Sequence, residues 1–342
     1  MADGARYSEL SRPGLKARAA GRARPPRIEI GLVNNMPDAA LQATERQFAD
    51  LVADAAAAGG VDVRLRLFSL SGVPRTALTR QAMDGRYGDM TALKAAGLDA
   101  LIVTGAEPRT PDLRAEPFWG ELADLVDWAR DNTASTLWSC LAAHAAVLHL
   151  DGIERQPLAE KCAGVFLCER VADDPMVEGV PAMTRMPHSR RNGLPIVDLA
   201  AKGYHLLTES REAGADVFLR REPSLFVFFQ GHPEYDADGL LREYCRDVGR
   251  HLRGEQAQPP ALPTGYFDTA TESAFRALAA EAVRAPQARL MIRCGEIAAA
   301  FTPPQPWKPH AQTLIRNWIG QLALAKGLVA EGLKMVGDGV MT

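Results

Sequence analysis

The first half of the chain repeats one pattern, in which a short apolar run ends in a tight loop and a helical pattern follows. Residues 28–33, 98–104 and 135–139 have the length and composition of buried strands. This alternation predicts an α/β fold with a doubly wound, mostly parallel sheet flanked by helices. The helices expected after these three runs cover residues 39–57, 119–130 and 141–150.

Three loops follow the predicted strands and are the first candidates for a binding site. They are residues 34–38, residues 105–109 and the turn at Cys140. In doubly wound sheets, ligands bind beyond the carboxyl ends of the strands. We therefore expect these loops to meet at one edge of the sheet and to line a site there.

Cys140 lies where the strand 135–139 changes abruptly into a helical pattern. Such a turn pushes a side chain out at the end of the sheet, and the helix N-terminus there favours negative charge. Both effects make a thiol a better nucleophile. The alternative is a buried structural cysteine, because a free cysteine packs as a small hydrophobic side chain.

The sequence Gly-His-Pro-Glu at residues 231–234 supports the reactive alternative. It follows another apolar run, residues 224–230, and Gly231 allows a sharp turn at the strand end. His232 would then reach the same edge as Cys140, and Glu234 would orient the imidazole. Cysteine, histidine and glutamate in these roles form a triad of nucleophile, general base and orienting carboxylate.

The rest of the chain predicts three regions: a basic tail (1–27), a main domain (28–253) and a C-terminal extension (254–342). The final amphipathic helix of the extension is expected to pack on the main domain or on a second subunit, which leaves a homodimer possible. The remaining expected elements are strands at 61–68, 164–168 and 217–219, a polar loop at 186–190, a helix at 237–253, a linker at 254–264, a helix at 272–285, a proline-rich break at 303–309 and a helix at 312–333.

Composition narrows the possible functions. The 342 residues carry a net charge of only −3, so nothing indicates a nucleic-acid or membrane surface as partner. No apolar run is long enough to span a bilayer. The five cysteines lack the spacing of a zinc site or a disulfide framework, so we expect free thiols, a reducing cytoplasm and no metal. No phosphate-binding glycine loop is present.

Five short motifs resemble the homoserine O-succinyltransferase/O-acetyltransferase family, whose fold is similar to that of class I glutamine amidotransferases. They are Asn-Met-Pro at 35–37, Thr-Glu-Arg-Gln-Phe at 44–48, Leu-Ile-Val-Thr-Gly-Ala at 101–106, Pro-His-Ser-Arg at 187–190 and Gly-His-Pro-Glu-Tyr-Asp at 231–236. The resemblance implies an enzyme of methionine biosynthesis that transfers an acyl group, succinyl favoured over acetyl, from acyl-CoA to the hydroxyl of L-homoserine. Acyl-CoA is a co-substrate, and no bound cofactor is implied.

The resemblance also implies roles for individual residues. Cys140 matches the nucleophile that carries the acyl group as a thioester, and His232 and Glu234 match its base and orienting carboxylate. The implied substrate-binding residues are Lys161, Ser189, Arg246, which would hold the amino-acid carboxylate, and Glu243, three residues before it.

The chain departs from the family pattern at four places. The family commonly has lysines directly after Met-Pro, whereas this chain has Asp38 followed by two alanines. Leu141 replaces the usual tryptophan, and its backbone N–H is the expected oxyanion donor. The position that separates succinyl from acetyl donors falls on Arg109, which we expect to pair with the distal carboxylate of a succinyl group. Residues 262–304 resemble an insertion.

Several alternatives stay open from the sequence. The same residues would grip serine or another hydroxy amino acid. A glutamine amidotransferase-type hydrolase would use the same triad, although the neighbours of Cys140 are not the glycines usual in that class. A non-catalytic relative would keep the fold alone.

Overall fold

Ten strands form one continuous sheet in the computed structural model, which describes residues 27–328 apart from 222, 286 and 288. The strand order is β3-β2-β1-β4-β5-β10-β9-β8-β6-β7. Strands β3 to β10 in this order pair in parallel, and β10, β9, β8, β6 and β7 continue the sheet in antiparallel pairs. The predicted basic tail, apart from Arg27, and residues 329–333 of the predicted last helix lie outside the described residues.

The parallel half confirms the predicted α/β fold. Its strands are β1 (Ile28–Val33), β2 (Val63–Phe68), β3 (Tyr87–Gly88), β4 (Ala100–Val103), β5 (Ser135–Ser139) and β10 (Leu225–Phe229). The strand order reverses between β1 and β4, which lie side by side. A crevice opens beyond the carboxyl ends of the strands at such a reversal, and ligands bind there.

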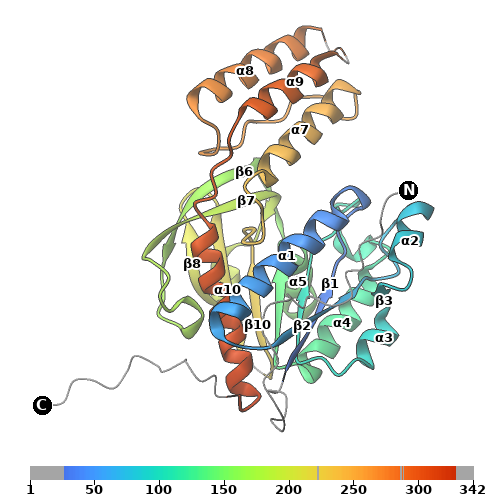
Figure 1. Cartoon of the computed structure of the whole chain (residues 1–342), viewed down its shortest axis with the longest axis vertical. Coiled ribbons are helices and arrows are strands. Elements are labelled where there is room, and N and C mark those ends of the chain that lie inside the picture. The colour runs from blue at the N-terminus through green and yellow to red at the C-terminus, as the bar shows by residue number, and fades with distance from the viewer. Residues whose placement is uncertain (1–26, 222, 286, 288, 329–342) are drawn as a thin grey trace, which may run out of the picture.

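Helices cover both faces of the parallel strands. On one face, Val103 and Trp138 pack against α4 (Trp119–Asn132) and α5 (Leu141–Asp151). On the other face, the alternate side chains of the same strands pack against α1 (Asp38–Gly59) and α10 (Lys308–Ala325), as Figure 1 shows. Burial on both faces explains why these strands are continuous apolar runs. The short helices of the parallel half are α2 (Ala77–Met83) and α3 (Met90–Lys94), with a 3₁₀ turn at Leu113–Ala115.

The antiparallel half contains one element that the sequence predicted wrongly. Its strands are β6 (Gln156–Arg170), β7 (Met183–Gly193), β8 (His205–Ser210) and β9 (Gly214–Arg221), with a 3₁₀ turn at Pro175–Val177 and helix α6 (Ile196–Ala201). Residues 186–190 belong to β7 and are not a polar loop. Alternate side chains, including His188 and Arg190, are buried against the protein, so polar residues occupy an inward-facing strand and hide its apolar periodicity. The prediction also missed β8.

The described part of the C-terminal region, up to residue 328, adds four helices. Helices α7 (Gly239–Leu252), α8 (Thr269–Arg284) and α9 (Arg289–Ala300) share a third apolar cluster, and Figure 1 shows α8 and α9 at the end of the molecule beyond the sheet. Helix α9 was not predicted. Helix α10 returns to the sheet and packs along α1. It is also tied to β5, because the indole Nε1 of Trp318 donates to Oγ of Ser135 at 2.8 Å. Within the described residues, no helix is long and apolar enough to cross a membrane.

Candidate active site

Cys140 occupies the turn between β5 and α5 in a strained conformation. Its φ of 51° and ψ of −108° make it the one non-glycine residue with positive φ among those the structure describes. Its N–H donates to the carbonyl oxygen of Phe229 at 2.7 Å, which ties the turn to the end of β10. Strain of this kind persists only where the surrounding structure holds it, and it aims the nucleophile out of the sheet in other strand-to-helix turns.

Leu141 follows as the first residue of α5, so its N–H has no intrahelical carbonyl to bond. Gly105, in the loop after β4, approaches this group closely. A Cβ at position 105 would lie 3.1 Å from the Leu141 nitrogen and 2.9 Å from its Cβ. The glycine therefore leaves space in front of the expected oxyanion donor.

His232 is held from two sides beyond the end of β10. The backbone N–H of His232 donates to the carbonyl oxygen of Pro187 on β7 at 2.8 Å. Its Nδ1 lies 2.8 Å from Oε1 of Glu234, so this carboxylate orients the ring. Nε2 is buried and has no hydrogen-bond partner among the described residues. A base with one nitrogen oriented and the other available has the form a triad requires.

The electrostatics of His232 favour its protonated form. Burial alone would lower the pKa of this imidazole, but the charges of Glu234 and of a Cys140 thiolate together raise the pKa well above its ordinary value. Both carboxylate and thiolate interact with one ring. A protonated imidazole beside the sulfur suits a cysteine nucleophile, because the imidazolium offsets the negative charge that the sulfur carries during attack.

Gly231 is required by close packing rather than by a positive φ. A Cβ at this position would lie 2.5 Å from Cγ of Met186 and 2.7 Å from Oδ1 of Asp216. The backbone before His232 thus rests directly on buried side chains of β7 and β9. Any larger residue would push the base away from Cys140.

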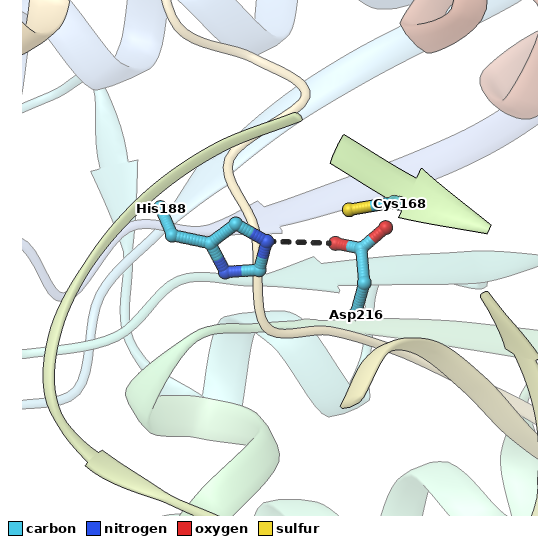
Figure 2. A group of neighbouring side chains, drawn as sticks. All are labelled: Cys168, His188 and Asp216. Atoms are coloured by element: carbon cyan, nitrogen blue, oxygen red, sulfur yellow. Dashed lines mark ion pairs between the residues drawn. The ribbon is translucent and has the colours of Figure 1, made fainter. Parts of the chain in front are cut away.

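The support beneath Gly231 is a buried group of Cys168, His188 and Asp216 from three strands, shown in Figure 2. Nε2 of His188 lies 3.3 Å from Oδ1 of Asp216, and the other oxygen accepts from Oγ1 of Thr208 at 2.8 Å. Burial lowers the pKa of His188 and raises that of Cys168, so both side chains are favoured in their neutral forms.

The same three residues are of types that bind metal ions, and one ligand atom from each lies within 4.8 Å of the others. Among the described residues, these three form the group best suited to bind a metal ion. The sequence did not reveal this group, because strand pairing brings together residues far apart in the chain. The contacts of Asp216 with His188 and Gly231 make it a support for the turn that carries His232.

Cys140 and His232 open onto a cleft of about 310 Å³, which we name the inner cleft. All three predicted loops contribute to it. Lys161, Ser189, Glu234, Glu243 and Arg246 line it as well, so the structure brings every predicted catalytic and substrate-binding residue together.

All four predicted substrate-binding residues belong to one network of charges and hydrogen bonds centred on Glu243 and Asp247. Nζ of Lys161 lies 2.8 Å from Oδ2 of Asp247 and 3.5 Å from Oε2 of Glu243. The hydroxyl of Ser189 donates to Oε2 of Glu243, and Arg246 binds Oδ1 of Asp247 at 3.0 Å. Burial would raise the pKa of both carboxyls, but Lys161 and Arg246 hold them below their ordinary values.

Tyr235 connects this network to the base. Its ring stacks on that of His232 with centroids 4.3 Å apart, and its hydroxyl donates to Oε1 of Glu243. Both oxygens of Glu243 are therefore already hydrogen-bonded. A carboxylate oxygen can accept more than one hydrogen bond, so Glu243 can still accept from a substrate ammonium group beside these protein donors.

Sequence reasoning missed three residues of this site. Tyr235 lies inside the recognised motif at 231–236 and Asp247 directly follows Arg246, so both were close to a visible signal. Arg155 had none. It lines the inner cleft, its Nη2 donates to the carbonyl oxygens of Thr110 and Pro111, and its Nη1 is buried with no partner among the described residues.

Arg109 lines a second cavity of about 680 Å³, the outer cleft, and is absent from the lining of the inner one. Asp38, Ala39 and Ala40, which stand where the family commonly has lysines, also line the outer cleft. The substitutions at residues 38–40 and at Arg109 therefore lie in the outer cleft, whereas Leu141 lines the inner one.

A family model described as homoserine O-succinyltransferase matches residues 14–325. The chain belongs to this family. A homoserine O-succinyltransferase from Rhodopseudomonas palustris is 52% identical over 296 residues, covering 86% of this chain and 88% of the relative. One from Methylorubrum extorquens is 49% identical over 308 residues, covering 89% of each.

The family match confirms the resemblance and the prediction of an acyltransferase, and it sets aside the hydrolase and the non-catalytic relative. Among solved structures, a glutamine amidotransferase from Methylobacillus flagellatus has 14% identity and a TM-score of 0.49, covering 86% of this chain and 94% of that one. The family assignment does not depend on this weak likeness.

Proposed function

We propose that this acyltransferase moves a succinyl group from succinyl-CoA to the hydroxyl of L-homoserine through a thioester on Cys140, in methionine biosynthesis. The supporting observation is the strained Cys140 turn in one 310 Å³ cleft with the His232–Glu234 pair. The names of the relatives support the two substrates.

In the first half-reaction, the Cys140 thiolate attacks the thioester carbonyl of the donor. The developing oxyanion accepts a hydrogen bond from the N–H of Leu141. The tetrahedral intermediate collapses with cleavage of the bond to sulfur, and His232 protonates the departing CoA thiolate. Glu234 stabilises the imidazolium throughout this step.

In the second half-reaction, neutral His232 removes the proton of the homoserine hydroxyl, whose oxygen attacks the acyl-enzyme. The Cys140 sulfur leaves as a thiolate beside the His232 imidazolium, and the enzyme returns to its starting state. Because CoA departs before the acceptor reacts, the kinetics are ping-pong.

The charged network supplies a grip for the amino-acid acceptor. Arg246 is the proposed partner of its carboxylate, Glu243 of its ammonium group, and Lys161 and Ser189 hold Glu243 in place. Serine would use the same grip, so the acceptor is the part of the proposal that needs a direct assay.

The succinyl group carries a distal carboxylate that an acetyl group lacks. We propose Arg109 as its partner. Arg155 is a second candidate, because it lines the inner cleft and donates to the carbonyl oxygens of Thr110 and Pro111 next to Arg109. No cofactor is part of the proposal, since CoA is a co-substrate. Five free thiols are consistent with a reducing cytoplasm.

Mass spectrometry of the intact protein after exposure to succinyl-CoA, without acceptor, tests the mechanism. We expect one succinyl group on the peptide that contains Cys140, and its removal on addition of homoserine. A Cys140→Ala variant is the matched control and should stay unlabelled. Wild-type protein that releases no CoA and carries no label would refute the proposal. Crossing two donors, succinyl-CoA and acetyl-CoA, with homoserine and serine identifies both substrates.

A further inference from the structure

The outer cleft adjoins the inner cleft and differs from it in volume and in the charge of its lining. Residues shared by both linings, among them Met36, Tyr235 and Arg246, form the boundary between them. The outer cavity is about twice the volume of the inner one, which already contains the nucleophile and the amino-acid network. The outer cleft is therefore the larger neighbouring space that could receive the other end of a donor whose thioester lies at Cys140.

Arginines dominate the charge of the outer cleft. Its lining contains six arginines and three carboxylates, a net charge of +3. The arginines are Arg46, Arg75, Arg109, Arg242, Arg246 and Arg250, and the carboxylates are Asp38, Glu107 and Glu243. Guanidinium groups present several fixed N–H donors that match phosphate oxygens.

Not all six arginines are equally free to bind a ligand. Arg75 is buried and donates to the carbonyl oxygens of Met36 and Asn34, so it shapes the wall. Arg250 pairs with Glu107 at 2.8 Å, and Arg246 belongs to the amino-acid network. The more exposed groups are Arg46, Arg109 and Arg242.

Arg46 and Arg242 come from different helices and converge on one carboxylate. Nη2 of Arg46 lies 2.7 Å from Oδ2 of Asp236, and Nη2 of Arg242 lies 3.5 Å from the same oxygen. Asp238 binds Arg242 from the other side at 3.1 Å. These aspartates do not line the cavity, and the two arginine side chains remain 56% and 42% exposed. The aspartates thus hold two guanidinium groups in place while leaving N–H donors open to the cleft.

The first turn of helix α1 adds a second attraction for anions. Its N-cap is Pro37, which provides no side-chain cap, and residues 37–40 line the outer cleft. The N-terminus of a long helix favours a phosphate through its free N–H groups and its dipole. Asp38 is already engaged, because it accepts from the N–H of Thr76 at 2.9 Å and lies 3.5 Å from Arg75.

We propose that the outer cleft binds the phosphorylated nucleotide end of the acyl-CoA donor, with Arg46 and Arg242 as phosphate-binding residues. This inference rests on the proposed function, because it assigns the far end of the same substrate. The thioester and the phosphates of acyl-CoA lie at opposite ends of a long arm. Cys140 and these two arginines likewise lie in separate clefts, so each cleft would hold one end of the donor. The lining also contains the small apolar residues Ala39, Ala40, Ala43 and Pro74, against which the adenine would pack.

The experiment compares two donors that share the thioester end, one with and one without the phosphorylated nucleotide. Succinyl-CoA and the thioester of succinate with N-acetylcysteamine acylate Cys140 under single-turnover conditions, and the ratio of their second-order rate constants is measured. We expect the ratio to fall about tenfold or more in the double variant Arg46→Glu, Arg242→Glu, because charge-assisted contacts to phosphate are lost. The matched control is Arg276→Glu on α8, an exposed arginine that pairs with Glu272 away from both clefts.

An unchanged ratio in the double variant would overturn the proposal. Should that variant fail to fold, competition in wild-type protein decides the matter: adenosine 3′,5′-bisphosphate should slow acylation by succinyl-CoA, whereas adenosine should not. Equal effects of the two compounds would count against phosphate recognition. Absence of label on wild-type Cys140 from either donor would instead refute the proposed function itself, so the two failures are distinguishable.

Discussion

Nζ of Lys161 on β6 lies 2.8 Å from Oδ2 of Asp247 on α7, although 86 residues separate them in the chain. The Asp247 side chain is only 4% exposed and also binds Arg246. It therefore anchors two of the positive charges that face the amino-acid end of the inner cleft. A buried carboxylate with two cationic partners is costly to neutralise, because each partner loses a charge-assisted hydrogen bond.

Replacing Asp247 by Asn should weaken acceptor binding more than acylation of Cys140. Lys161 and Arg246 would lose their shared anchor, and we expect KM for homoserine to rise about tenfold to a hundredfold, which corresponds to 1.5–3 kcal/mol for a charged hydrogen bond. Steady-state kinetics with both substrates varied, together with single-turnover acylation, would measure this. A similar slowing of both half-reactions would contradict the assignment.

Replacing Glu234 by Gln should impair the base and change the pH dependence of stability. We expect kcat to fall by a factor of about 10² to 10⁴, as for loss of an orienting carboxylate. The raised pKa of His232 in the folded protein means that its protonated form contributes stability below the unfolded pKa of about 6.5. This contribution is lost as the pH rises through the folded pKa.

The unfolding free energies of wild type and Glu234→Gln should therefore differ most at about pH 6 and converge as the pH is raised. Urea unfolding at several pH values measures the difference. A gap that widens with rising pH would show that Glu234 does not stabilise the imidazolium.

Replacing Arg109 by Glu should lower the preference for succinyl-CoA over acetyl-CoA. A guanidinium that holds the distal carboxylate contributes about tenfold to a hundredfold to this ratio. Arg114→Glu is a nearby control, since Arg114 pairs with Asp112 and Glu154 and lines neither cleft. If Arg155→Met lowers the ratio and Arg109→Glu leaves it unchanged, the distal carboxylate belongs to Arg155.

Replacing Gly231 by Ala should destabilise the protein and slow both half-reactions. The added Cβ would lie 2.5 Å from Met186 and 2.7 Å from Asp216, and overpacking of this kind costs about 1–3 kcal/mol. Gly120→Ala in α4 is the matched control, because no heavy atom lies within 4 Å of a Cβ there. Chemical unfolding and CoA release would be measured together. Equal stability of both variants would show that the backbone at Gly231 adjusts freely.

The sequence by itself determined the parallel half of the sheet, apart from the two-residue strand β3, and the identity of the family. Apolar runs buried on both faces, with helical periodicity between them, report local structure directly. The motif at residues 231–236 placed histidine and glutamate two residues apart at a strand end, so their contact at 2.8 Å follows from the local chain. The sequence did not predict strand β7, because His188 and Arg190 are buried polar residues. Their presence removes the apolar–polar alternation that marks a strand.

Tertiary structure alone decided which side chains share a cleft. Strand pairing sets Ser139 of β5 opposite Phe229 of β10, and this register brings the Cys140 turn to the His232 turn. The contact of Lys161 with Asp247, the reach of Arg155 to the inner cleft and the convergence of Arg46 and Arg242 depend on how elements distant in sequence pack. These distances are fixed by sheet register and helix packing, so periodicity and local propensity contain no information on them.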